Sequence, residues 1–533
     1  MSNKENIPLS ELLYLLYFGI LFLTKSLGVI EGTTIYSIAL VLGFVCYGMK
    51  LACTKHTLFE CICIALLLGL GAAVYYFSGE KGILLCVTML TGMKGVTRDG
   101  VMKLALMILS VCMAFNIFTA AFGYQSDYIM ISKRPRGVMF RHSLGYPYPT
   151  SLLVAWLILV MLVAYHVGME DTRRWVIATV VMVAITIYLY VYSDSRGGVL
   201  AVVFFIFLVS YFKTHEKFYM VDKALIWIAY AIMAFFPVIG PMVIGQKLFT
   251  GVFGKLGSMK IRWEVAEDYL SRVPFTPFGS KFELGTYGLD MSPMYLFLQL
   301  GVVTFIIINF LWVLVIRDSI KRNDRIEVAI IVVLLLMGMT EPFLYNLSFR
   351  NIAFIYMGKS FFQWSQKHMS SGALSKEVGL SLGDKLCKIK RVRIGFERKL
   401  DVKELIGVAG LYAAIAGVIF LVSCEVFPVH ETLYMSETSA GKEDLIMDPT
   451  YLSKDEVSQL KKEGYIVSGY KNEETDMYEY GGKFEATDGK KYNTKDAVIR
   501  EYRYRNMSRA VWGSLLITGI FTVYLRKKKD EPK

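Results

Sequence analysis

Residues 149–168 read PTSLLVAWLILVMLVAYHVG, an apolar run without a single Asp, Glu, Lys or Arg. Its length matches the ~20 residues that an α-helix needs to cross the hydrocarbon core of a bilayer. Similar runs recur along most of the 533 residues, so that 55% of the chain is hydrophobic and only 19% is charged. The sequence therefore predicts an all-α polytopic membrane protein with little room for a soluble catalytic domain.

We expect about fourteen membrane-spanning helices, of which the first twelve form a core. They are predicted at 10–29, 34–52, 58–77, 82–96, 101–122, 149–168, 174–192, 198–212, 224–245, 294–316, 327–345, 347–365, 404–424 and 510–525. The polar residues 1–10 hold no basic region followed by a small-residue cleavage site. The first apolar run is therefore predicted to be a retained span and not a cleaved signal.

Lysine and arginine gather in alternate loops, which predicts the orientation of the chain. The basic positions lie at 50–55, 94–103, 173–174, 213–223, 317–325, 385–403 and 526–529. By the positive-inside rule these loops are cytoplasmic, and so are both termini. This pattern accounts for the net charge of +13 without a nucleic-acid partner. We expect the basic linker 366–403 to lie on anionic membrane lipids as an orientation signal.

The predicted organisation has three parts. Residues 1–365 form the transmembrane core with a long external loop at 246–293, residues 366–403 form the cytoplasmic linker, and residues 404–533 form a two-helix C-terminal unit. Between the last two helices, the polar segment 425–509 is expected to form a small α+β external domain.

Two local patterns describe the external domain. Ser453 to Gly464 has the acids, bases and terminating glycine of a short helix. Tyr465 to Tyr492 has strand-like residues interrupted at Gly481-Gly482 and Asp488-Gly489, which predicts a hairpin.

The cysteines predict neither disulfides nor a metal site. None of the eight lies in 425–509, and Cys61-Ile62-Cys63 has no second pair at the spacing of zinc ligands. We expect no metal and no cofactor.

The external loop is predicted to contain a helix at the membrane surface, from Ser258 to Val273. Ser258 is a candidate N-cap and Pro274 ends the pattern. The apolar side of this amphipathic helix is expected to hold Ile261, Val265 and Leu270.

Three arginines, Arg141, Arg196 and Arg262, lie just beyond apolar runs on the predicted outer side. Ionisable groups at this depth are costly, so each is a candidate ligand-binding residue. Arg141 is followed by His142, Arg196 stands two residues after Asp194, and Arg262-Trp263 combines a fork of donors with an aromatic face. The alternatives are snorkelling to lipid headgroups, an Asp194–Arg196 pair, and interfacial anchoring by Arg262-Trp263.

Two acids complete the outer set. Asp290 precedes the predicted span at 294–316, and Glu341 lies in Thr340-Glu341-Pro342-Phe343. A carboxylate partly withdrawn from water has a raised pKa and can serve as a general base near neutral pH. The alternative is that either acid only compensates an arginine.

The outer motifs resemble, in order and spacing, those of the O-antigen polymerase and O-antigen ligase superfamily. The matching stretches are 141–147 (RHSLGYP), 195–198 (SRGG), 262–263 (RW) with 277–279 (PFG), and Asp290 followed by Gly301. Thr340-Glu341-Pro342-Phe343 is similar to the polymerase branch found in capsule and exopolysaccharide clusters. The resemblance covers residues 10–365. It departs from the family at Tyr148-Pro149-Thr150, where many relatives have His-Pro-Asn, and at Met291 after Asp290, where the ligase branch has Asn after a histidine.

The resemblance implies a metal-independent glycosyltransferase in the cytoplasmic membrane of a bacterium. Its donor would be a glycan repeat unit on undecaprenyl pyrophosphate, which it would polymerise on the outer face. Arg196 and Arg262 would grip the pyrophosphate, with Arg141 third. The same interpretation assigns the remaining outer residues to binding of the pyrophosphate or the glycan (Arg136, Trp263 and Asp194) or to catalysis (Asp290, Glu341 and His142).

The C-terminal unit is similar in outline to polysaccharide chain-length regulators, and a flippase and such a regulator are the expected protein partners. Its deletion would then change product length and leave polymerisation intact; an additional domain with no such role is the alternative. Other functions stay open at this point: a ligase that transfers a finished glycan, a transporter or flippase of lipid-linked sugars, and a membrane sensor. No half-to-half similarity of the kind common in transporters is visible in the sequence.

Overall fold

The computed structural model describes most of the membrane-associated part of the chain. The described residues are 6–29, 32–122, 124–125, 129–134, 137–168, 172–244, 257–281, 289–345, 352–368, 373–379, 386–390, 402–426, 435–438, 465–468, 470–472, 477–479, 483–485, 491–493, 503 and 505–520.

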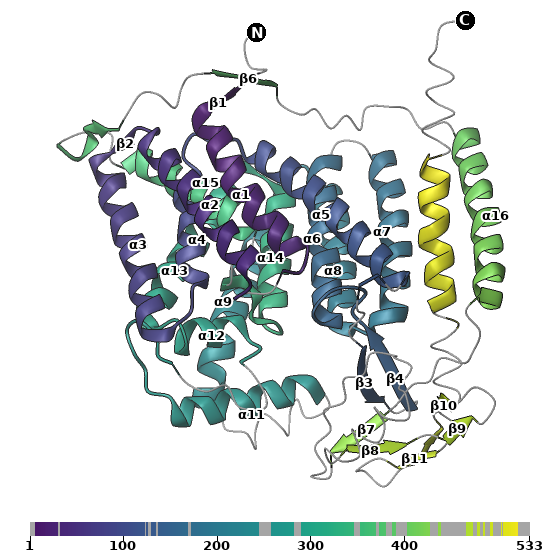
Figure 1. The fold of residues 1–533 in the computed structure, drawn as a ribbon. Coiled ribbons are helices and arrows are strands. Elements are labelled where there is room, and N and C mark those ends of the chain that lie inside the picture. Colours follow the sequence, from purple (N-terminus) through teal and green to yellow (C-terminus); the bar gives the residue numbers. More distant parts are fainter. Residues whose placement is uncertain are drawn as a thin grey trace, which may run out of the picture. The chain divides into compact units, whose positions relative to one another are not determined.

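The described residues are mostly helical. The α-helices are α1 Leu9–Ser26, α2 Thr34–Ala52, α3 Leu58–Ser78, α4 Gly82–Thr91, α5 Arg98–Ala121, α6 Pro149–Val167, α7 Thr172–Ser193, α8 Arg196–Lys213, α9 Met220–Val243, α11 Gly257–Arg272, α12 Ser292–Leu298, α13 Val302–Arg322, α14 Arg325–Gly338, α15 Ala353–His368 and α16 Val402–Val426 (Figure 1). A further helix covers 505–520. Two 3₁₀ turns are η1 Pro342–Tyr345 and η2 Ala373–Ser375.

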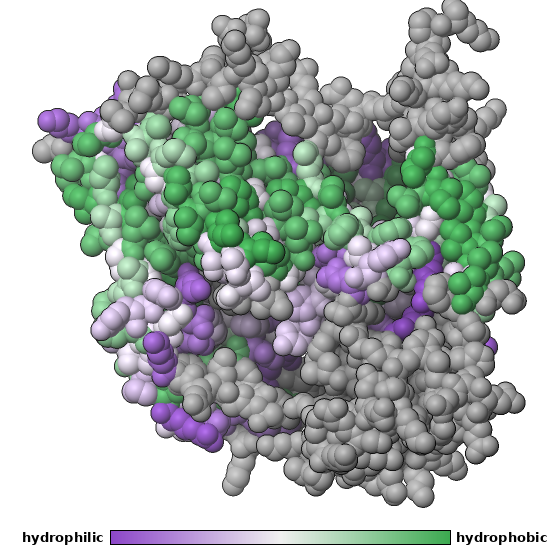
Figure 2. All heavy atoms as spheres, viewed as in Figure 1, coloured by the Kyte–Doolittle hydropathy of each residue, from purple (hydrophilic) through white to green (hydrophobic). Residues whose placement is uncertain are grey.

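Within the described residues, nine helices are long and apolar enough to cross a membrane, namely α1, α2, α3, α5, α6, α7, α8, α9 and α13. Large apolar side chains remain exposed on them, such as Leu66 (68%), Val180 (64%) and Leu200 (68%). Figure 2 shows such side chains gathered over α1, α2 and α3. An apolar surface of this extent is stable only against lipid, so the chain is a multi-pass membrane protein.

Several predicted spans differ from the observed helices. The expected span at 82–96 is only ten residues long as α4, because Gly92 follows it in a turn. The expected span at 294–316 is interrupted at Gly301, which separates α12 from α13 with a φ of 92°. The expected span at 327–345 ends as a helix at Gly338 and continues into η1. The number fourteen therefore stays a prediction.

The chain forms two compact units. Unit 1 comprises Met1–Ser110, Val154–Ala184 and Arg196–Ile394, and unit 2 comprises Val111–Leu153, Ile185–Ser195 and Gly395–Lys533. These boundaries run through α5, α6 and α7 and join the C-terminal helices to segments of the expected core. The division expected from the sequence, with 1–365 separate from 404–533, stays a prediction.

In unit 1, helices neighbouring in sequence pack as pairs, α1 with α2 and α3 with α4, while α14 packs between α8, α9 and α13. Residues Ile326 to Leu335 of α14 are buried on all sides. The turn between α13 and α14 and the start of α5 lie at one end of this unit, and α11 and α12 lie at the other end (Figure 1).

The strands form two-stranded antiparallel sheets. The pairs are β1 Asn6–Pro8 with β6 Leu386–Lys390, β2 His56–Thr57 with β5 Glu377–Val378, β3 Ile129–Arg134 with β4 Gly137–His142, β7 Met435–Thr438 with β8 Tyr465–Ser468, β9 Tyr470–Asn472 with β10 Met477–Glu479, and β11 Lys483–Glu485 with β12 Lys491–Asn493. Two segments of the basic linker thus pair with segments of the core, through β5 and β6.

In the polar segment 425–509, the structure describes the strands β7 to β12 and helical residues at the two ends, 425–426, 503 and 505–509. β11 and β12 pair across 486–490, which confirms the hairpin expected at Asp488-Gly489. The helix expected at 453–464 lies outside the described residues. The α+β organisation of this segment stays a prediction.

Candidate functional site

The surface helix expected in the external loop is present as α11, from Gly257 to Arg272. It begins one residue earlier than expected, so Ser258 lies inside the helix and not at its cap. It runs across the end of unit 1, where α9 ends (Figure 1). Figure 2 shows hydrophilic side chains among the coloured residues at this end, which fits a helix at a membrane surface.

The side of α11 that is buried against the protein has a different phase from the apolar side noted in the sequence. Ile261 is 47% exposed, and the expectation that its side faces the membrane stays a prediction. The buried side chains are instead Trp263 (3%), Ala266 (0%), Tyr269 (7%) and Val273 (8%). The large indole of Trp263 determines this phase, because burying it removes more apolar surface than burying any aliphatic neighbour.

Trp263 anchors α11 on α9. Its ring centroid lies 5.3 Å from that of Phe236, and a Cβ at Gly240 would overlap the indole ring. The sequence indicated Trp263 as a face for stacking on a sugar. In the structure its ring is used for packing, and its glycan-binding role stays a prediction.

Arg262, the residue before Trp263 on α11, lies beside the acid expected as base. A guanidinium Nη of Arg262 lies 3.4 Å from a carboxylate oxygen of Asp290, and these side chains are 19% and 50% exposed. Burial raises the pKa of the Asp290 carboxyl above 3.8, and the positive charge of Arg262 opposes part of that rise. Asp290 is therefore a stronger base than an ordinary aspartate and lies next to a cation.

Ser292 connects the Thr340-Glu341-Pro342-Phe343 turn to the segment that carries Asp290. Its hydroxyl donates to the backbone carbonyl of Glu341 at 2.5 Å and accepts from the backbone N–H of Leu344 at 3.4 Å. Because Ser292 stands two residues after Asp290, both predicted acids belong to one neighbourhood. We call Arg262, Asp290, Ser292 and Glu341 the Arg262 cluster.

Two glycines fix the loop that follows α11. Gly279 and Gly301 have φ values of 82° and 92°, and a Cβ on either would overlap the backbone of the other's segment. The N–H groups of Val302 and Val303 donate to the carbonyls of Thr276 and Pro277 at 3.0 and 3.1 Å. The backbone of 276–279 therefore packs directly against the start of α13. Only glycine fits at Gly279 and Gly301, because a side chain there would overlap the neighbouring backbone.

An acid that sequence reasoning missed lies nearby in unit 1. The Glu80 carboxylate, in the turn between α3 and α4, accepts a hydrogen bond from the Gln299 amide at 3.0 Å. Gln299 is 5% exposed. The only sequence signal was an isolated acid in a short predicted outer turn.

Unit 2 contains the second predicted group. The segment 123–148, which the sequence predicts to be external, holds the β3–β4 hairpin, in which Arg141 is paired with Met130. Nε of Arg141 donates to the carbonyl oxygen of Ser193 at 2.9 Å, and Arg141 is only 9% exposed. This contact attaches the hairpin to the C-terminal end of α7, where carbonyl groups lack helical partners and favour cations.

His142 and Asp194 are buried beside this contact, with exposures of 1% and 5%. The imidazole ring meets the Tyr192 ring edge-on at 5.8 Å. Asp194 has a φ of 43°, an unusual value for a residue other than glycine, and strain of this kind is concentrated at functional sites. We call Arg141, His142, Tyr192, Ser193 and Asp194 the Arg141 cluster.

Two predicted residues, Arg196 and Arg136, belong to neither of these named clusters. Arg196 is the first residue of α8, belongs to unit 1 and is exposed. Arg136 lies outside the described residues.

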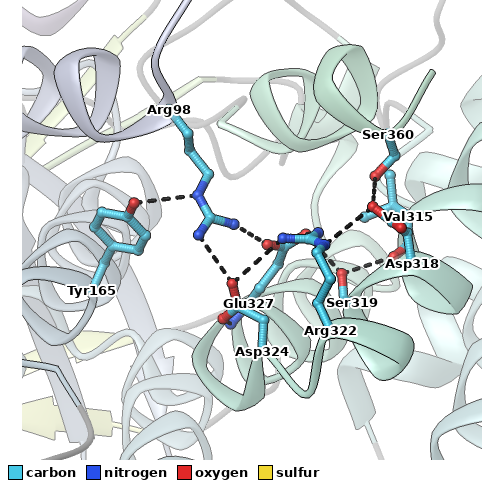
Figure 3. A network of polar contacts seen from close by, with 9 residues as sticks. All are labelled: Arg98, Tyr165, Val315, Asp318, Ser319, Arg322, Asp324, Glu327 and Ser360. Carbon is cyan, nitrogen blue, oxygen red and sulfur yellow. Dashed lines mark hydrogen bonds and ion pairs between the residues drawn. The ribbon is translucent and has the colours of Figure 1, made fainter. Parts of the chain in front are cut away.

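A larger charged network lies at the other end of unit 1 (Figure 3). Arg98 contacts Asp324 at 3.0 Å and also contacts Glu327, while Arg322 contacts Glu327 at 2.9 Å and Asp318 at 3.2 Å. The Tyr165 and Ser360 hydroxyls complete it at 3.2 and 3.0 Å from Arg98 and Asp318. The sequence indicated these bases only as orientation signals. Because each charge here has an opposite partner, the network is a structural clamp between α5, α13 and α14.

No family model, no curated protein and no solved structure matches this chain.

Proposed function

We propose that the protein is a membrane glycosyltransferase that polymerises oligosaccharide repeat units carried on undecaprenyl pyrophosphate. The observation that carries this proposal is the Arg262–Asp290 pair at 3.4 Å, held beside Ser292 and the Glu341 turn. A cation for a departing phosphate and a base for an attacking hydroxyl are the two groups that such a transfer needs.

The reaction proceeds by displacement at the anomeric carbon of the donor. The oxygen of an acceptor hydroxyl forms the new glycosidic bond, its proton passes to the Asp290 carboxylate, and the bond between the anomeric carbon and the pyrophosphate breaks. The electron pair leaves with the lipid pyrophosphate, whose growing negative charge the Arg262 guanidinium stabilises. Roles for Arg196, Arg141 and Glu341 in holding the donor belong to the same proposal.

The proposed side of action is the outer face of the cytoplasmic membrane. In unit 1, the start of α5 lies at the end opposite α11 (Figure 1). Arg98 is the first residue of α5, and Arg322 is the last residue of α13 and belongs to the same charged network (Figure 3). The positive-inside rule makes that end cytoplasmic and puts the Arg262 cluster outside. Lipid-linked repeat units are the substrate class available there to a chain embedded in the membrane.

The test compares variants of two arginines on the same helix. Arg262→Ala is expected to reduce polymerisation by about 10²–10³-fold, the effect of removing one donor from an oxyanion-type site. Single repeat units on lipid should then accumulate in place of the ladder of polymer. Arg272→Ala is the matched control, because Arg272 is 73% exposed and only pairs with Asp268 on its own helix.

Analysis of lipid-linked and polymeric glycan by gel and mass spectrometry separates the outcomes. Full activity of Arg262→Ala would refute the assignment. Transfer of one intact glycan to another acceptor, without a ladder of sizes, would replace the polymerase by a ligase.

A further inference from the structure

The helix at 505–520 holds the last turns of α7 through the Tyr188 hydroxyl, within unit 2. This oxygen accepts the indole N–H of Trp512 at 2.9 Å and shares a second hydrogen bond with the Ser508 hydroxyl at 2.8 Å. Because an indole N–H can only donate, the Trp512 bond has one possible direction. Two side chains of the C-terminal helix therefore fix one tyrosine of α7.

Tyr188 in turn contacts the Arg141 cluster. Its ring centroid lies 4.9 Å from that of Tyr192, one helical turn later, and Tyr192 meets His142 edge-on. The next residue, Ser193, supplies the carbonyl oxygen that accepts the hydrogen bond from Arg141. Tyr192 and His142 are each 1% exposed, so neither ring can shift without displacing its neighbours.

The C-terminal helix is itself held at another point by Arg509. Arg509 is 7% exposed and donates through Nε to the carbonyl of Ala121 at 3.3 Å, and through Nη1 to Asn506 at 2.9 Å. This buried contact keeps the helix in the position from which Ser508 and Trp512 present their polar groups to Tyr188.

We infer that Tyr188, Ser508 and Trp512 are positioning residues, which hold His142 and the Arg141-binding carbonyl for an anionic group of the donor within unit 2. The inference rests on the proposed function and extends it, because it makes the last helix part of the donor-binding machinery. Polymerisation itself then depends on this helix, whereas a pure length regulator would change only product size.

The kinetic test uses single changes in the full-length protein. Tyr188→Phe removes the shared hydroxyl and keeps the ring, so it should raise the KM for the lipid-linked donor about fivefold and leave kcat within about twofold. Ser508→Ala should act in the same direction. The double variant should be no worse than Tyr188→Phe alone, since both changes break the same hydrogen bond.

Tyr412→Phe is the matched control. It removes a hydroxyl of α16 that donates to the same C-terminal helix, at the carbonyl of Val511. Its KM should equal that of the unchanged protein. An equal rise of KM in Tyr412→Phe and Tyr188→Phe would reduce the effect to general loosening of the helix and would overturn the inference.

A second readout does not depend on the activity. The chain has six histidines, so ¹³C-histidine labelling of the full-length protein in micelles gives a simple NMR spectrum in which His142→Gln identifies the His142 signal. The edge-on Tyr192 ring imposes a ring-current shift on that signal. Tyr188→Phe and Ser508→Ala should move it, and Tyr412→Phe should not.

The two readouts separate failure of this inference from failure of the proposed function. An unmoved His142 signal in Tyr188→Phe overturns the inference whatever the protein catalyses. A moved signal with an unchanged donor KM, in a preparation that polymerises, overturns the link to donor binding. Absence of polymerisation in the unchanged protein refutes the proposed function, and with it the donor role. A moved His142 signal would then still support the inference that Tyr188 and Ser508 position His142.

Discussion

The guanidinium of Arg262 and the carboxylate of Asp290 lie 3.4 Å apart, which joins the surface helix α11 to the loop before α12. The position of Arg262 follows from packing, because its neighbour Trp263 is 3% exposed and is seated over Gly240 of α9. A small-residue position within a membrane helix thus determines the geometry of an ion pair at the surface.

The first prediction concerns Gly240. Gly240→Ala should displace Trp263 and with it Arg262, because the added methyl group would overlap the indole ring. We expect a loss of polymerising activity of about tenfold or more, as misplacement by ~1 Å can cost about a hundredfold. The control is Gly48→Ala on α2, where an added Cβ meets nothing within 4 Å. Equal activity of the two variants would contradict this account of α11.

The second prediction uses the pH dependence of the rate. A general base acts when deprotonated, so activity should fall as pH falls through the pKa of Asp290. Since that pKa is raised, the fall should begin at a higher pH than an ordinary aspartate would give. Arg262→Lys keeps the positive charge, so its activity should fall over the same acidic pH range as that of the unchanged protein. In Arg262→Gln the residual activity should fall at a higher pH, because the charge that lowers the pKa of Asp290 is gone.

A third prediction separates function from stability at Asp290. A carboxyl whose pKa is raised in the folded state stabilises the fold only while protonated, and this stabilisation is lost as pH rises through the folded pKa. At pH 7 Asp290→Asn should therefore leave the melting temperature unchanged or higher, while it lowers kcat by about 10²–10⁴-fold. A melting temperature that drops together with activity would indicate a structural role.

The sequence predicted the transmembrane class, the surface helix and the outer residues of the Arg262 cluster, because each leaves a local signal. Apolar length predicts spans, Pro274 ends α11, and charges beyond apolar runs indicate binding residues. The sequence did not reveal that Trp263 is buried against α9, because helical periodicity could not show that Gly240 leaves room for an indole ring.

Contacts between distant segments left no such signal. Tyr188, Ser508 and Trp512 meet only because the last helix packs on α7, and nothing in the local sequence around any of them indicates the others. The same holds for the ion pair between Arg98 and Glu327. The sequence placed Arg98 in a basic loop and Glu327 at the end of a predicted span, and nothing indicated that they meet. Pairing between elements depends on tertiary packing, which a single sequence does not reveal.

The last prediction concerns Asp324, which has two separable roles in the clamp of Figure 3. Its carboxylate caps α14 by accepting from the backbone N–H of Glu327 at 3.1 Å, and it pairs with Arg98 at 3.0 Å. Burial raises the pKa of Asp324, but the charge of Arg98 and the hydrogen bonds from Glu327 and Arg98 lower it more, so that it lies below 3.8. Asp324 therefore stabilises the fold above about pH 4, and this contribution is lost as pH falls through the folded pKa.

Asp324→Asn keeps a capping oxygen and loses the charge, whereas Asp324→Ala loses both. At pH 7 we expect both variants to melt at lower temperature, with Asp324→Ala lower by the further ~1 kcal/mol of an N-cap. At a pH below the folded pKa of Asp324, the Asn variant should approach the unchanged protein, because Asp324 is itself protonated there, while the Ala variant should remain less stable. Thermal unfolding in detergent at both pH values measures the two differences, and a pH-independent gap for Asp324→Asn would show that the Arg98 pair contributes nothing.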